Sequence, residues 1–265
     1  MNYKNYPLGQ LISVAELVRP KPVYLCIFGS QNYEMDIWTD EYSSDIDFKA
    51  IIMPTLHNLV RSQKPTSEVI NVPTGHVDVK DIRVFFDALL KCNPVYLECF
   101  LTEHWLGSSS FKYPRALTQM VVWENRERFI NSCFGMMNEK FKALQHPSPA
   151  AMPNLKKFGY NPKQLHHLLR FAKMIEDFET CGRMILVPSN KDFLIDVKLG
   201  VLSESAAVQL AKTTLDNSRE LVNNLLKEYT QQCHVWDSTE QMRNWAFNLT
   251  ESKIYEKIIE QNSGL

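Results

Sequence analysis

The chain of 265 residues lacks several patterns that define common classes of protein. It contains no run of about 18 apolar residues, so no membrane-spanning helix is expected. Its first residues lack the charged-then-apolar pattern of a secretory signal, which predicts a cytoplasmic protein. The formal net charge of −1 gives no overall basic signal for nucleic-acid binding, although a local basic groove is compatible with it.

The cysteines do not favour a zinc protein or a disulfide-rich protein. The six cysteines form no C-x-x-C pair and no paired Cys/His spacing, so a structural zinc site is not expected. A disulfide framework is not expected either, because the chain has no secretory signal. Cys26 lies within an apolar segment and is expected in the core.

Short apolar segments bounded by turns occupy the first part of the chain, and long helical patterns follow them. Strands are expected at residues 23–28, 45–53, 65–72 and 76–80. Helices are expected at residues 8–19, 82–92, 94–102, 116–145, 162–181, 203–232 and 238–261. The sequence therefore predicts an α+β fold, with a small mixed β-sheet core at 1–106 and an α-helical domain at 107–265, joined at the GSSS segment 107–110.

The most informative segment contains Gly29-Ser30 after an apolar run, followed by Asp45 and Asp47 at the start of another. Residues i and i+2 of a strand share one face, so Asp45 and Asp47 are expected side by side. Two adjacent carboxylates repel each other unless a cation lies between them, and Mg²⁺ prefers carboxylate oxygen. The Gly29-Ser30 turn is where a triphosphate would be held, because glycine allows a close approach of the backbone.

This pattern resembles the polymerase-β-type nucleotidyltransferases, and it is most similar to their small predicted bacterial and phage members. Three segments carry the resemblance: GSQNYEMD…SSDIDFKAIIMP (29–54), HVDVKDIR (76–83) and YNPKQLHHLLR (160–170). The resemblance implies a metal-dependent enzyme that transfers an NMP from an NTP, with ATP as the expected donor, to an acceptor hydroxyl and releases pyrophosphate. It also implies that 1–106 is the nucleotidyltransferase core and that 107–265 binds substrate and nucleotide, with both held in a cleft between them.

The resemblance assigns roles to individual residues. Asp45 and Asp47 would bridge two Mg²⁺ ions, for which Mn²⁺ could substitute. Asp78, in the apolar-Asp-apolar segment 77–79, would complete the second metal site and draw the proton from the acceptor. Asp81 is the alternative third carboxylate, although a role as N-cap of the helix 82–92 explains it without catalysis.

The remaining expected nucleotide contacts are Gly29, Ser30 and Gln31 at the turn and Lys163, His167 and Arg170 on the helix that begins at Pro162. The last three share one helix face, opposite an apolar stripe formed by Leu165, Leu168, Leu169 and Ala172. The basic face would meet the triphosphate or a nucleic-acid backbone. The alternative is an ordinary solvated face. The loop 33–43 is longer than the resemblance leads us to expect.

Three hypotheses for the acceptor and the activity follow. An RNA 3′ end, such as that of tRNA, is the first choice by analogy with the superfamily. A protein hydroxyl is the second, in which case the enzyme would transfer AMP to Ser, Thr or Tyr. The third is a non-catalytic module that senses nucleotides or binds a partner. No RNA-recognition sequence is present to decide among them.

Overall fold

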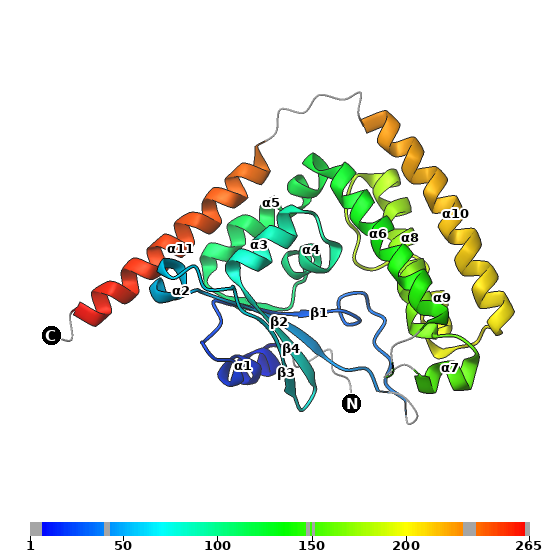
Figure 1. The fold of residues 1–265 in the computed structure, drawn as a ribbon, viewed down its shortest axis with the longest axis horizontal. Helices are drawn as coiled ribbons and strands as arrows, with labels where there is room; N and C mark the ends of the chain where they lie inside the picture. The colour runs from blue at the N-terminus through cyan, green and yellow to red at the C-terminus, as the bar shows by residue number, and fades with distance from the viewer. Residues whose placement is uncertain (1–6, 40–42, 147–148, 150–151, 230–236, 263–265) are drawn as a thin grey trace. The chain divides into compact units, whose positions relative to one another are not determined.

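A computed structural model describes residues 7–39, 43–146, 149, 152–229 and 237–262 (Figure 1). The chain divides into two compact units, and each unit is assembled from segments that are distant in sequence. Unit 1 consists of Met1–Asn32, Ser44–Glu124 and Trp236–Leu265. Unit 2 consists of Tyr33–Ser43 and Asn125–Val235.

Unit 1 is built on a mixed sheet of five strands, in the order β3-β4-β2-β1-β5 within the described residues. The strands are β1 (Tyr24–Phe28), β2 (Asp47–Ile52), β3 (Ser67–Val72), β4 (Gly75–Asp81) and β5 (Trp105–Gly107). Strand β2 runs parallel to β4, whereas the other neighbouring strands are antiparallel. The central strands β1 and β2 are nearly all buried, which explains why β1 is a continuous apolar run and why β2 is apolar apart from Asp47 and Lys49. The predicted α+β fold with a small mixed sheet is confirmed.

Helices α3 (Ile82–Leu90) and α4 (Pro94–Leu101) pack together beside the sheet (Figure 1). The Tyr24 hydroxyl on β1 donates a hydrogen bond to the carbonyl of Cys99 on α4 at 2.7 Å. The Tyr24 ring also contacts Phe100 and Phe111, with ring centroids 5.2 and 4.9 Å apart. Burying these aromatic rings supplies much of the apolar contact that holds α4 on the sheet.

The other helices of unit 1 are α1 (Pro7–Leu17), α2 (Leu56–Val60), α5 (Lys112–Glu124) and α11 (Ser238–Asn262). Helix α11 belongs to this unit because Trp245 packs into the aromatic core. Its ring centroid lies 5.7 Å from that of Phe86 and 5.0 Å from that of Phe111. The Glu124 carboxylate at the end of α5 also accepts the backbone amide of Ser238 at 2.7 Å.

Outside Tyr33–Ser43, the described residues of unit 2 form helices and the turns that join them. Its helices are α6 (Arg126–Gln145), α7 (Met152–Phe158), α8 (Pro162–Cys181), α9 (Lys191–Leu199) and α10 (Glu204–Tyr229). Helices α6 and α8 run antiparallel: Cys133 Sγ lies 3.9 Å from Met174 Sδ, and the Asn161 amide donates to the Leu144 carbonyl at 3.1 Å. None of the described helices is long and apolar enough to cross a membrane.

The two units do not coincide with the predicted segments 1–106 and 107–265. The GSSS segment at 107–110 is not a linker between them, because Gly107 ends β5 and Ser108 caps the 3₁₀ helix Ser109–Phe111. The chain instead passes from unit 1 to unit 2 between Glu124 and Asn125. Sequence reasoning placed the boundary where strands give way to helices, but α5 and α11 complete the core of unit 1.

The single helix predicted over 116–145 is wrong. Helices α5 and α6 are separate and meet at Asn125, whose φ of −109° and ψ of 33° are not helical. Strand β5 and helices α2, α7 and α9 were not predicted. By contrast, the structure confirms Asp81 as the N-cap of α3, and it ends α8 at Gly182 with φ of 66°. The predicted end of the helix 203–232 lies outside the described residues.

Candidate functional site

The Gly29-Ser30 turn lies against the carboxylate of Asp47. Strand β1 ends at Phe28, which is the register partner of Asp47 on β2. The chain then turns at Gly29, whose φ of 87° is in the left-handed region that favours glycine. A Cβ atom at Gly29 would lie 3.5 Å from Asp47 Oδ2. The turn is fixed from α4, where Glu98 Oε1 accepts the Gly29 amide at 2.7 Å. Glu98 was not predicted.

Asp45 and Asp47 lie on either side of the buried residue Ile46 in the sequence, and Asp47 is the first residue of β2. The amide of Ile46 donates to the Thr74 carbonyl at 2.8 Å, which fixes this segment to the β3–β4 hairpin. The side chain of Gln31 donates to the Asp45 carbonyl at 2.8 Å. The structure thus brings the Gly29 turn to the Asp47 carboxylate and links Gln31 to the backbone of Asp45. The expected placement of the Asp45 and Asp47 side chains on one strand face stays a prediction, because strand β2 begins only at Asp47.

A ladder of charged side chains continues from Asp47 along β2 and β4. His76 Nδ1 lies 2.8 Å from Asp47 Oδ1, and the two side chains are 37% and 26% exposed. The parallel register then pairs Lys49 with Asp78, two residues further along each strand. His76 was not predicted, although the strand alternation of residues 76, 78 and 80 could have indicated it.

Asp78 is held by two ammonium groups. Lys49 Nζ lies 2.7 Å from Asp78 Oδ2, and Lys80 Nζ lies 2.9 Å from Asp78 Oδ1. Burial acts to raise the pKa of Asp78, but these two cations lower it below its ordinary value. The predicted third carboxylate is therefore on the same sheet as Asp47, but it faces lysines.

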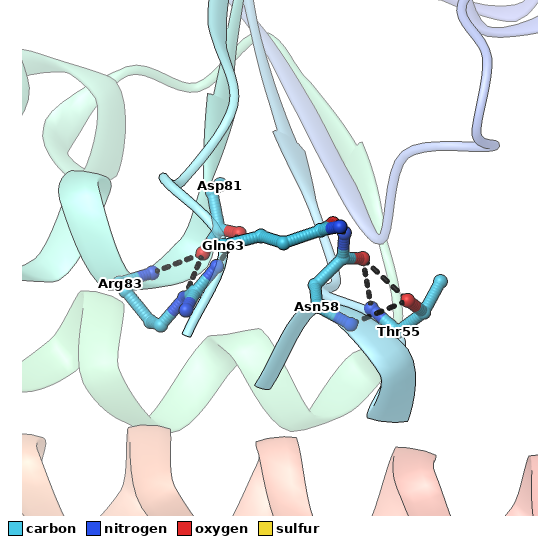
Figure 2. Close-up of polar contacts among 5 residues, drawn as sticks. All are labelled: Thr55, Asn58, Gln63, Asp81 and Arg83. Atoms are coloured by element: carbon cyan, nitrogen blue, oxygen red, sulfur yellow. Dashed lines mark hydrogen bonds and ion pairs between the residues drawn. The ribbon is translucent and has the colours of Figure 1, made fainter. Parts of the chain in front are cut away.

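Asp81, the alternative third carboxylate, is engaged by its own helix (Figure 2). Its Oδ1 accepts the Arg83 amide and Arg83 Nε, each at 2.9 Å, and its Oδ2 accepts Arg83 Nη2 at 2.7 Å. Asp81 is only 2% exposed. Nearby, Thr55 and Asn58 form the capping box of α2, and Asn58 also donates to Gln63. The hydrogen bonds from Arg83 give Asp81 a structural role.

The acidic pair fits a divalent cation better than the full predicted triad does. Asp45 and Asp47 supply the carboxylate oxygens that Mg²⁺ prefers. Asp78 does not fit as a ligand while Lys49 and Lys80 hold it. Across the described residues, no group of three or more His, Cys, Asp or Glu side chains gathers as a metal site. An open pocket of about 430 Å³ lies beside Asp45 and is lined by Asp45, Val69, Asn71, Val72, Pro73, Gly75 and His76.

The predicted basic face of α8 lies in unit 2. The apolar stripe opposite it is confirmed, since Leu165, Leu168, Leu169 and Ala172 are all buried. Lys163 is exposed, whereas Arg170 is only 7% exposed and stacks on Tyr33, with its guanidinium carbon 3.9 Å from the ring centroid. The Arg170 end of this face is therefore not an ordinary solvated surface. The ring of Tyr33 covers the Arg170 end of it.

His167, on the same face, is a neutral group among cations. Burial, followed by the charge of Arg170, lowers the pKa of His167 well below its ordinary value. Lys163 and Lys140 contribute in the same direction. The antiparallel packing of α6 against α8 explains why Lys140 was not predicted, because it comes from a separate helix.

Unit 2 also contains buried polar atoms of the kind that ligands satisfy. The Tyr33 hydroxyl, Gln164 Oε1 and His167 Nδ1 have no hydrogen-bond partner among the described residues. Buried polar atoms in folded proteins are nearly always paired, so such a group of exceptions suggests a ligand or water.

Comparison with known proteins gives no further assignment. No protein-family model matches the chain, and no curated protein matches it. The function must therefore be argued from the geometry of Gly29, Asp45 and Asp47 in unit 1 and of the α8 face in unit 2.

Proposed function

We propose that this protein is a metal-dependent nucleotidyltransferase that moves an NMP from an NTP, with ATP as the first candidate, to an acceptor hydroxyl. One observation carries the proposal: the left-handed turn at Gly29 lies against the Asp47 carboxylate, with 3.5 Å between that carboxylate and the position of the missing Cβ. A turn without a side chain beside the Asp47 carboxylate is suited to a phosphate chain and a cation together.

Each residue has a separate task in this proposal. Asp45 and Asp47 would hold Mg²⁺, which when bound would neutralise charge on the phosphates. Ser30 would donate its hydroxyl and amide to phosphate oxygens. Gln31 holds the backbone of Asp45 in place through its 2.8 Å hydrogen bond. Catalysis would come mainly from positioning of the reactants and from charge neutralisation.

The α8 face of unit 2 is, by itself, a second candidate for binding phosphate. Lys163 and Arg170 carry positive charge, and His167 is held neutral by its surroundings. Arg170 is oriented by the ring of Tyr33, so its planar group is already ordered. We propose an RNA 3′ end as the acceptor, since these cations suit a nucleic-acid backbone as well as a triphosphate. A protein hydroxyl is the second choice.

A second candidate function is nucleotide binding without transfer. It is favoured by the state of Asp78: Lys49 and Lys80 neutralise this carboxylate, so it is not free to complete a second metal site. A binding module of this kind would retain affinity for nucleotide but would release no pyrophosphate.

The decisive experiment uses α-labelled ATP, GTP, CTP and UTP with Mg²⁺ and a total cell extract, followed by separation of RNA from protein. Wild type is compared with Asp45→Asn/Asp47→Asn. Asp87→Asn is the matched control, because Asp87 is an exposed aspartate that pairs with Lys91 on α3.

Label in RNA that the double variant loses and the control keeps supports the proposed RNA acceptor. Label in protein with the same dependence identifies AMP transfer to a polypeptide. Nucleotide binding without any variant-sensitive label would contradict the enzyme and support the binding module.

A further inference from the structure

We infer that Lys49 and Lys80 take the place of a second metal ion, so that the chain binds one divalent cation, held by Asp45 and Asp47. This inference rests on the proposed function and differs from the two ions that the sequence resemblance implies. Its basis is the surroundings of Asp78, the carboxylate expected to complete a second metal site.

Lys49 is fixed in place as a buried cation. Its side chain is 2% exposed, and the register of β2 against β4 places it directly beside Asp78. Its ammonium also lies 4.6 Å from the ring centroid of Phe28 and 4.3 Å from that of Tyr96. A metal ion at Asp78 would have to displace this ammonium and leave a buried charge without its partner, which is strongly unfavourable.

Lys80 engages the other oxygen of the same carboxylate. Its Nζ lies 2.9 Å from Asp78 Oδ1, and it also donates to Ser67 Oγ on β3 at 2.6 Å. Each oxygen of Asp78 therefore already has a cation beside it. A divalent ion approaching Asp78 would meet two positive charges at short range.

The position beside Asp47 leads to the same conclusion. The side chain that contacts Asp47 from β4 is His76, at 2.8 Å, and not a carboxylate. Two carboxylates are a sufficient protein contribution for a single Mg²⁺, which keeps several waters and takes its remaining ligands from substrate phosphates. In the inferred arrangement, Lys49 and Lys80 supply fixed positive charge where a second ion would otherwise lie.

The test counts Mn²⁺ ions bound to the full-length protein, using the electron paramagnetic resonance signal of free Mn²⁺ without nucleotide. We expect one Mn²⁺ per chain in the wild type. Asp45→Asn should weaken this binding at least tenfold, whereas Asp78→Asn should leave the affinity within twofold. Asn at 78 can still accept a hydrogen bond from Lys49, and circular dichroism checks that the variant is folded.

Two Mn²⁺ ions per wild-type chain, or a tenfold loss of affinity in Asp78→Asn, would overturn the inference and leave the proposed function standing. No Mn²⁺ bound at millimolar concentration would contradict both. Should Asp78→Asn fail to fold, the wild-type count still decides. Lys49→Met/Lys80→Met provides the converse measurement, because freeing Asp78 should raise the count to two; an unchanged count in a folded double variant would contradict the inference.

Discussion

The guanidinium group of Arg170 is stacked on the ring of Tyr33, with 3.9 Å between its central carbon and the ring centroid. Both side chains are buried, at 7% and 1% exposure, and both belong to unit 2. Arginine suits this contact because its planar, weakly hydrated group can lie flat on an aromatic face. The stacking attaches Tyr33 to α8 and orders the Arg170 guanidinium, which the sequence pattern placed on a basic helix face.

We expect Tyr33→Leu to lower the free energy of unfolding by about 0.5–2 kcal/mol, which is the range of a cation–π contact. Tyr33→Phe is the matched control, because it keeps the ring and removes a buried hydroxyl that has no partner among the described residues. It should be neutral or stabilising. Urea unfolding measures both variants, and equal losses in the two would argue against the stacking.

We expect Gly29→Ala to destabilise the protein by about 1–2 kcal/mol, because alanine is strained at a φ of 87°. The added methyl would also lie 3.5 Å from Asp47 Oδ2 and weaken nucleotide binding. Gly135→Ala on α6 is the control: its Cβ would meet nothing within 4 Å, so it should stabilise the helix by about 0.5–1 kcal/mol. Thermal unfolding and nucleotide titration test the pair, and tighter nucleotide binding in Gly29→Ala would contradict the assignment.

We expect the folded protein to lose stability as the pH is lowered, because of His166. Burial lowers the pKa of His166 to about 3, against about 6.5 in an unfolded chain, and its Nδ1 lies 2.9 Å from the Leu194 carbonyl. The unfolded chain therefore takes up a proton below pH 6.5 that the folded chain refuses. The stability is fully present above pH 6.5 and is lost as pH falls, by about 2 kcal/mol at pH 5.

His166→Asn is the variant that checks this prediction. Asparagine can keep a donor close to the position of Nδ1, but it does not titrate. Urea unfolding between pH 5 and pH 7.5 should show a shallower dependence in the variant than in the wild type. Identical slopes would mean that His166 is not the group responsible.

Glu124→Gln should loosen α11. The Glu124 carboxylate accepts the amides of Ser238 and Thr239 at 2.7 and 2.9 Å and the Thr239 hydroxyl at 2.7 Å. Hydrogen bonds to a charged group contribute about 1.5–3 kcal/mol, and the glutamine amide cannot accept as many. Hydrogen exchange in α11 should accelerate in this variant. Glu251→Gln, at an exposed position of α11, should leave it unchanged.

The sequence predicted the sheet well, because the central strands of the sheet are short, mostly apolar segments between clear turns. Strands β1 and β2 lie within a few residues of their predicted ranges. The break at Asn125 was missed because amphipathic patterns continue on both sides of it. Strand β5 was missed because three residues are too few for a pattern, and it exists only through its pairing with β1.

The candidate site shows the same division between local and distant relationships. The proximity of Gly29 to Asp47 could be anticipated, since both lie at the ends of adjacent predicted strands. The lysines around Asp78 depend on strand register, which one sequence does not reveal. The stacking of Arg170 on Tyr33 joins residues far apart in the chain, and no local pattern encodes it.

The return of α11 to unit 1 has a consequence for how the protein is made. On the ribosome, residues up to Glu124 emerge long before Trp245, which packs against Phe86 and Phe111. At about 5–20 residues per second, the delay is on the order of ten seconds. During that time the nascent chain presents an uncovered aromatic surface, while the whole helical part of unit 2 is being translated. Completion of unit 1 therefore waits for the synthesis of α11, and a chaperone that shields aromatic surfaces should increase the yield of folded protein.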